Sequence, residues 1–270
     1  MPSCAVRTTA RIARDQTRHG FLAFTLIELL VVMAIIALLA TIGLPALKGF
    51  GKGNAEAAAH RQMLDDIALA RLRAISGRTT VYMLFVPAGI PGHRNAINAS
   101  SLPPEQKARQ TKQLTNLISG QYTAYALFAW RSVGAQPGRN NPRYLTEWKR
   151  LPEGILFDPG KFNTNFVGTP GFTSLNLPLE YGQGFSYDFF PFPAANSPGY
   201  SLPYIAFNPL GQLISGRDEL IPLARGSVFY PNNVPDVVIK PLNNFTNNYV
   251  RLNWLTGRAS LDEYTRPKFN

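Results

Sequence analysis

Few side chains of this 270-residue sequence are suited to metal or nucleophilic chemistry. There is one cysteine, Cys4, so neither an internal disulfide nor a site built from several thiolates is available. Of the three histidines, His60 stands in a helical pattern and His93 in a segment expected to be a loop. Isolated histidines of this kind are most often ordinary side chains rather than metal ligands. We therefore expect no metal site and no cofactor.

Two carboxylate positions could hold a hard cation such as Ca²⁺. One position is Asp158, and the other is the pair Asp218-Glu219. Both stand in segments expected to be loops, and their carboxylate oxygens are ligands that suit Ca²⁺. However, the spacing of an EF-hand is missing, and so are the phosphate-binding loop and the Gly-x-Ser-x-Gly nucleophile motif. We expect ordinary surface carboxylates at these positions and no enzymatic activity.

The carboxylate in the most unusual setting is Glu28. It is the one ionisable side chain in the 27 residues from Phe21 to Leu47, and Leu29 to Ala40 are all apolar. A helix needs about 20 mostly apolar residues to cross a bilayer, so this run is long enough. Four arginines stand in residues 1–20, which predicts a cytoplasmic N-terminus.

Two simpler interpretations of the apolar run fit less well. A secretory signal peptide has a shorter apolar core that ends at a cleavage site. A plain membrane anchor leaves Glu28 unexplained, because a carboxylate at membrane depth costs about 2.5–3.5 kcal/mol, less near the interface. The carboxylate therefore indicates a function of its own.

The nine residues from Phe24 to Val32, Phe-Thr-Leu-Ile-Glu-Leu-Leu-Val-Val, resemble the mature N-terminus of type IV pilins and type II secretion pseudopilins. The resemblance implies cleavage by prepilin peptidase between Ala23 and Phe24, followed by N-methylation of Phe24. Glu28 is then the fifth mature residue, and the resemblance implies that its carboxylate guides assembly. Pro45 follows Glu28 at the family's spacing for a proline that bends the long N-terminal helix.

A second cleavage site stays open, because the family's peptidase usually cuts after glycine. The pair Gly20-Phe21 offers such a site, but a cut there would make Glu28 the eighth mature residue. We prefer the cut after Ala23, since alanine is also small and only this register aligns both Glu28 and Pro45 with the family. On that cut Cys4 leaves with the leader peptide.

The segments that follow predict a helix and then strands. Residues 55–75 are rich in helix formers, and Gly77 is expected to end the helix, while three glycines in residues 49–53 are expected to loosen it. An apolar stripe at three- and four-residue steps should pack on a sheet. The stripe consists of Leu64, Ile67, Ala68, Leu72 and Ile75.

β-Branched and aromatic runs predict the strands. They occupy 79–86, 121–131, 204–207, 220–223, 237–240, 249–255 and 259–261. A short helix is expected at 104–117 inside a long loop, and residues 134–199 are expected to be mostly irregular. The predicted fold class is α+β, with a long N-terminal helix packed on an antiparallel β-sheet that carries long irregular insertions.

Three further motifs resemble H-type minor pseudopilins. They are the stretch Ala70 to Ile75 before the first strand, Phe207 before a Pro-x-Gly turn, and Trp254-Leu255-Thr256-Gly257-Arg258 in a terminal hairpin. The resemblance covers residues 24–86 and, more loosely, 203–262. Residues 87–200 match no family pattern.

The chain is basic, with a formal net charge of +11. Its 45% apolar and 16% charged residues exclude an intrinsically disordered chain. One basic group near the C-terminus is a candidate anion-binding surface and consists of Arg251, Arg258, Arg266 and Lys268. A second basic group consists of Arg139, Arg143, Lys149 and Arg150. Because some H-type members capture DNA, a DNA-binding minor pilin is the alternative function.

Together these features predict three parts: a prepilin leader at 1–23, a pilin helix at 24–77 with a transmembrane segment at 24–47, and an extracytoplasmic β-rich domain at 78–270. The expected protein is a structural subunit of a type II secretion or type IV pilus-like filament. Its expected partners are prepilin peptidase, other pilin or pseudopilin subunits and the bacterial inner membrane. The expected location is a single pass through that membrane with the C-terminal domain in the periplasm.

Overall fold

A computed structural model describes residues 25–131, 141–162, 184–239 and 248–263, apart from the side chains of 40–54, 239, 248 and 263. The chain divides into two compact units, residues 1–49 and 50–270. In the described parts it combines helices with antiparallel sheets, so the predicted α+β class is confirmed at that level.

One long helix, α1 (Leu26–Gly77), extends through the boundary between the units. It ends at Gly77 as predicted, but the glycines at 49–53 do not interrupt it. Its buried face also differs from the predicted stripe, because Leu72 is 60% and Ile75 38% exposed. The fully buried residues of this face are Ala59, Met63, Ile67, Ala70 and Ala74.

A six-stranded antiparallel sheet packs against this part of α1. Its order is β3-β2-β1-β7-β6, and β4 extends the β3 edge by pairing with β2. The strands are β1 (Val81–Phe85), β2 (Ala124–Ala129), β3 (Arg143–Tyr144), β4 (Lys149–Arg150), β6 (Ser186–Pro191) and β7 (Gly199–Phe207). In β1, Val81, Met83 and Phe85 belong to the core shared with α1, as the alternation of side chains along a strand requires.

A second antiparallel sheet has the order β11-β10-β8-β5, with β9 also paired to β8. Its strands are β5 (Ile155–Phe157), β8 (Glu219–Phe229), β9 (Asp236–Ile239), β10 (Asn248–Leu252) and β11 (Ala259–Glu263). Ile221 of β8 and Val250 of β10 join the same apolar core as the buried face of α1. One core therefore holds the second half of α1 and both sheets together.

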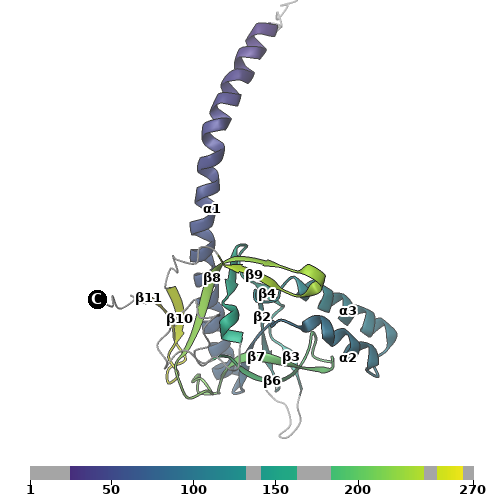
Figure 1. Ribbon diagram of the computed structural model, residues 1–270. Helices are drawn as coiled ribbons and strands as arrows, with labels where there is room; N and C mark the ends of the chain where they lie inside the picture. Colours follow the sequence, from purple (N-terminus) through teal and green to yellow (C-terminus); the bar gives the residue numbers. More distant parts are fainter. Residues whose placement is uncertain (1–24, 132–140, 163–183, 240–247, 264–270) are drawn as a thin grey trace, which may run out of the picture. The chain divides into compact units, whose positions relative to one another are not determined.

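The opposite face of the six-stranded sheet is covered by two further helices, α2 (His93–Ala99) and α3 (Pro104–Ile118), which lie together in Figure 1. Ile97 of α2 and Leu114 of α3 pack with Phe128 and Phe190 of the sheet in a second apolar core. The helix predicted at 104–117 is confirmed, whereas α2 and the 3₁₀ turn η1 (Ile90–Gly92) form where a loop was expected.

The segment expected to be irregular, residues 134–199, contains more structure than predicted. Strands β3, β4, β5 and β6 and the 3₁₀ turn η2 (Pro159–Phe162) lie in its described parts. Aromatic packing replaces a clear alternating pattern here, because Phe190 and Phe192 are fully buried against rings from other segments. A last 3₁₀ turn, η3 (Pro231–Asn233), joins β8 to β9.

Candidate functional site

The first turn of α1 holds the carboxylate that the sequence singled out. The backbone N–H of Glu28 donates to the carbonyl oxygen of Thr25 (3.1 Å) and to its hydroxyl oxygen Oγ1 (3.3 Å). Thr25 therefore caps a helix that starts at Leu26, with Glu28 three residues later, the spacing of a capping box. The acidic side chain also stands where the positive end of the helix dipole favours it.

Thr25 was not among the predicted functional residues, although the Thr-x-x-Glu spacing indicates this capping role. Ala23 and Phe24, the predicted cleavage and methylation site, lie outside the described residues. Pro45 lies within α1, in the part whose side chains are not described. The assembly roles of Glu28 and Pro45 therefore stay predictions.

The turns of α1 that follow Glu28 expose an apolar surface. Leu26 is 81% and Ile27 66% exposed, and the large apolar side chains along to Leu39 are at least 43% exposed. An apolar surface this continuous is normally covered by lipid or protein. Among the described residues, no helix is both long and apolar enough to cross a membrane. The predicted span at 24–47 includes residues outside the described side chains.

In the basic group near the C-terminus, Arg251 forms ion pairs with two carboxylates. Its guanidinium donates to Asp218 at 3.0 Å and lies 3.4 Å from Asp262, so opposite charges of the chain itself compensate it. Arg258 is exposed in the turn before β11. Arg266 and Lys268 lie outside the described residues. Anion binding by this group stays a prediction.

In the second basic group, two of the four residues have partners within the fold. Lys149 forms an ion pair with Asp66 of α1 (2.5 Å), which also accepts a hydrogen bond from the Tyr125 hydroxyl (2.6 Å). Arg150 donates to Ser119 Oγ and to the carbonyl oxygen of Asn116. Arg143 is exposed on β3, and Arg139 lies outside the described residues. Two members of this group thus hold the fold together.

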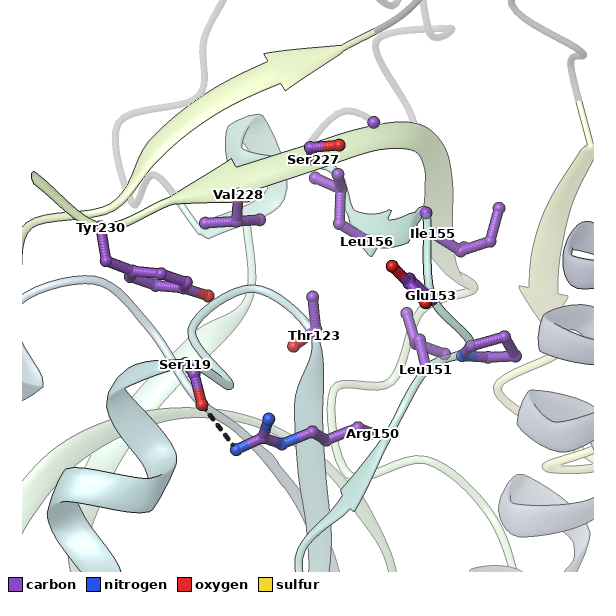
Figure 2. Close-up of a pocket in the computed structure, with 13 residues that line it drawn as sticks. Ser119, Thr123, Arg150, Leu151, Glu153, Ile155, Leu156, Ser227, Val228 and Tyr230 are labelled. Carbon is purple, nitrogen blue, oxygen red and sulfur yellow. Dashed lines mark hydrogen bonds between the residues drawn. The ribbon is translucent and has the colours of Figure 1, made fainter. Parts of the chain in front are cut away.

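A hollow of about 350 Å³ opens beside Arg150, between the end of α3, the β4–β5 segment and β8 (Figure 2). The hydrogen bond from Arg150 to Ser119 lies along its wall, and the hydroxyl of Tyr230 donates to the carbonyl oxygen of Gln121 (3.4 Å). Neither histidine nor cysteine is among the described residues that line it. Glu153 also lines the hollow, but among the described residues no hydrogen bond joins it to Ser119, whose Oγ donates to the carbonyl oxygen of Asn116 (3.0 Å) and accepts from Arg150.

Two buried titratable groups of the described chain, His93 and Lys161, have partners within the fold. His93, predicted in a loop, begins α2 and is buried, with Nε2 2.8 Å from the carbonyl oxygen of Phe192. Burial lowers the pKa of its imidazole, against two opposing backbone hydrogen bonds. Lys161 and Glu219 form a buried ion pair at 2.9 Å. Among the described residues, no group of three or more His, Cys, Asp or Glu side chains is placed to hold a metal ion.

Asp158 is buried rather than on the surface, which corrects the prediction for this carboxylate. Its Oδ1 accepts a hydrogen bond from the backbone N–H of Gly160 (2.7 Å), while Oδ2 is buried without a partner among the described residues. Burial raises the pKa of the carboxyl group, and the hydrogen bond only partly offsets that effect. Glu219 is likewise buried, in its pair with Lys161.

Residues 18–44 match the family described as the prokaryotic N-terminal methylation motif. The chain carries a prepilin-type signal. The matched segment contains the predicted cleavage site at Ala23 and Phe24, the capping residue Thr25 and the carboxylate of Glu28. No curated protein and no solved structure matches the chain.

Proposed function

We propose that the protein is a pilin-like structural subunit of a type II secretion or type IV pilus-like filament. The observation that carries the proposal is the methylation motif over residues 18–44, which implies processing by prepilin peptidase and assembly with other pilins. The cut falls between Ala23 and Phe24, and Phe24 is then N-methylated. The finer resemblance to H-type minor pseudopilins is part of this proposal.

The structure of α1 supports the proposal through its apolar first half. The large side chains from Leu26 to Leu39 are exposed, so this half needs a lipid or protein environment. A bacterial inner membrane meets this need before assembly, with the N-terminus cytoplasmic and the C-terminal domain in the periplasm. Neighbouring subunits meet it in the filament. The same apolar surface of α1 is then covered by lipid in the membrane and by protein in the filament.

The carboxylate of Glu28 fixes the position of one subunit along the helix of the next. The cut creates a positively charged amine at Phe24, four residues before Glu28. A charge buried without a partner is destabilising by several kcal/mol, roughly 3–5, whereas a paired one costs much less. The amine of a neighbouring subunit reaches Glu28 in the filament and fixes the position of each incoming chain.

Processing is tested by expressing the full-length chain in bacterial cells with and without a prepilin peptidase. The variants A23L and G20L each place a large side chain immediately before one of the two candidate cuts. We expect peptidase-dependent shortening of the wild type and of G20L, and none of A23L. The opposite pattern would move the cut to Gly20-Phe21. A wild-type chain that the peptidase leaves intact would refute the proposed function.

A further inference from the structure

Two hollows meet at Thr79, the residue that links α1 to β1. One, of about 390 Å³, is lined by Arg78 and Arg131 together with Tyr82 and Trp130. The other, of about 100 Å³, is lined by Arg73 and Arg143. Thr79 lines both of them. We call the four residues Arg73, Arg78, Arg131 and Arg143 the arginine rim.

The sheet topology brings together the four residues of the arginine rim from α1, the link between α1 and β1, the end of β2, and β3. Arg73 lies in the last turns of α1, and Arg78 follows the end of the helix in the left-handed region (φ 44°). Strands β1 and β2 are antiparallel, so the start of β1 lies beside the end of β2, after which Arg131 follows. Arg143 is paired with Ala129 at the same end of β2.

The four rim arginines are exposed, and they differ from the paired cations of the fold in their partners. Lys149, Lys161, Arg225 and Arg251 each form an ion pair with a carboxylate. None of the four rim guanidinium groups forms an ion pair or hydrogen bond with a described residue. The described residues that line the two hollows include no acid. Like charges gathered in this way create a positive potential that attracts anions.

We propose that the arginine rim binds an acidic segment of a partner protein, with the carboxylates of that segment paired to the rim guanidinium groups. The planar fork of arginine matches the two oxygens of a carboxylate and holds them through paired hydrogen bonds. Ser76, Thr79 and Thr80 line the hollows and add hydroxyl donors. A second copy of this chain complements the rim poorly, because its net charge is +11 and stays strongly positive when residues 1–23 are removed.

The aromatic rings at the rim favour an acidic peptide over a nucleic acid. Single-stranded nucleic acids bind by stacking their bases on open aromatic faces. Trp130 is stacked on Phe190 (centroids 5.9 Å apart) and meets Phe128 edge-on (5.1 Å). Tyr82 meets both Phe190 and Tyr204 edge-on. Both rings are half-buried in the sheet, so they offer the ligand apolar contact but no free stacking surface.

This inference rests on the proposed function in one respect, because a filament subunit must recognise other subunits and an acidic segment of one of them is the ligand. The binding experiment below does not depend on cleavage. Failure of the rim to bind would leave the peptidase experiment unaffected, and failure of processing would leave the binding result unaffected.

The test uses the full-length chain in a neutral detergent and labelled poly-L-glutamate as the probe, followed by fluorescence anisotropy at low and high salt. We expect salt-sensitive binding that R78Q/R131Q and R73Q/R143Q each weaken about fivefold to thirtyfold. The matched control R109Q/K112Q removes the same charge from the exposed part of α3 and should change the affinity less than about twofold. All variants must keep the thermal unfolding midpoint of the wild type.

Four results would overturn the proposal. The first is no binding of poly-L-glutamate by the wild type. The second is an equal loss in the control variant, which would show a general charge effect. The third is tighter, rim-dependent binding of an oligothymidylate of equal charge, which would make the rim a nucleic-acid site. The fourth is rim-dependent self-association of the chain, which would make a second copy the occupant.

Discussion

The hydroxyl oxygen of Thr25 accepts a hydrogen bond from the backbone N–H of Glu28 in the first turn of α1. Both residues lie within the matched methylation motif, so the motif encodes the start of the helix as well as a recognition signal. A Glu or Gln at the fourth position of such a box supports the cap equally, whereas only Glu carries a charge. The position of Glu28 at the start of the helix and its proposed role in assembly can therefore be separated by substitution.

Replacing Glu28 should impair assembly while leaving membrane insertion and cleavage intact, because the basic leader and the apolar run are unchanged. E28A removes the charge and the rest of the side chain, E28Q removes only the charge, and both keep the backbone N–H that donates to Thr25. We expect both variants to be excluded to a similar degree from filaments that contain wild-type subunits. Incorporation is measured with a tagged chain, relative to its amount in the membrane fraction. Normal incorporation of E28Q would show that the charge does not guide assembly.

Removing the hydroxyl of Tyr125 should loosen the contact between α1 and the six-stranded sheet. This hydroxyl donates to buried Asp66 (2.6 Å) and accepts from Gln62 (2.8 Å), both on α1. Y125F leaves a carboxylate oxygen of Asp66 without this donor, which should lower the free energy of unfolding by about 1.5–3 kcal/mol. Urea unfolding of the full chain, followed by tryptophan fluorescence, measures the change.

Y204F is the matched control for that substitution. The Tyr204 hydroxyl forms no hydrogen bond with any described residue and lies on the opposite face of the same sheet. Its loss should change the free energy of unfolding by less than about 0.5 kcal/mol. Equal effects of the two substitutions would mean that the Tyr125 hydroxyl does not stabilise the helix–sheet contact.

The stability contributed by Asp158 should decrease as the pH rises. Burial raises the pKa of its carboxyl group in the folded state. The folded state therefore favours the protonated form, so the contribution is full below the ordinary carboxyl pKa and is lost as the pH rises through the folded pKa. D158N keeps the acceptor for Gly160 without the charge, and should be more stable than the wild type at neutral pH.

The D158N advantage should shrink as the pH falls toward the ordinary carboxyl range. Denaturant unfolding at a series of pH values measures it, with D188N as the control at an exposed carboxylate. A D158N chain less stable than the wild type at neutral pH, or with the same difference at every pH, would contradict a buried, unpaired charge at Asp158.

The second half of α1 should be needed for the solubility of the β-rich domain. It buries Met63 and Ile67 against both sheets. A fragment of residues 54–270 is expected to fold, whereas one that starts at Arg78 should expose an apolar sheet face and aggregate. Size-exclusion chromatography and thermal unfolding compare them. A monomeric, cooperatively unfolding fragment from Arg78 would contradict this role of α1.

Local sequence signals predicted the elements that depend on local chemistry. The end of α1 at Gly77, helix α3 and strands β1, β2 and β10 follow from stop residues and from apolar periodicity. The wrong phase of the α1 stripe has a long-range cause. Asp66 faces the core because Tyr125 and Lys149, 59 and 83 residues away, supply its partners.

The candidate functional residues likewise divide into those that local sequence reveals and those that only the fold brings together. Glu28 was identified from its apolar neighbours, and its cap from Thr25 was implicit in the spacing. The arginine rim was not predicted, since Arg73, Arg78, Arg131 and Arg143 are scattered in the sequence and converge only through strand pairing. Likewise, Asp158 gives no sign in the sequence that it is buried.

The central claim, that this chain is a processed pilin-like subunit, is tested most directly by the mass of its mature N-terminus. The protein is extracted from membranes of cells that contain prepilin peptidase, and its N-terminal peptide is sequenced by mass spectrometry. We expect a chain that begins at Phe24 with one methyl group on the new amine. A start at Phe21 would correct the register alone, whereas a chain that still begins at Met1 would contradict the account.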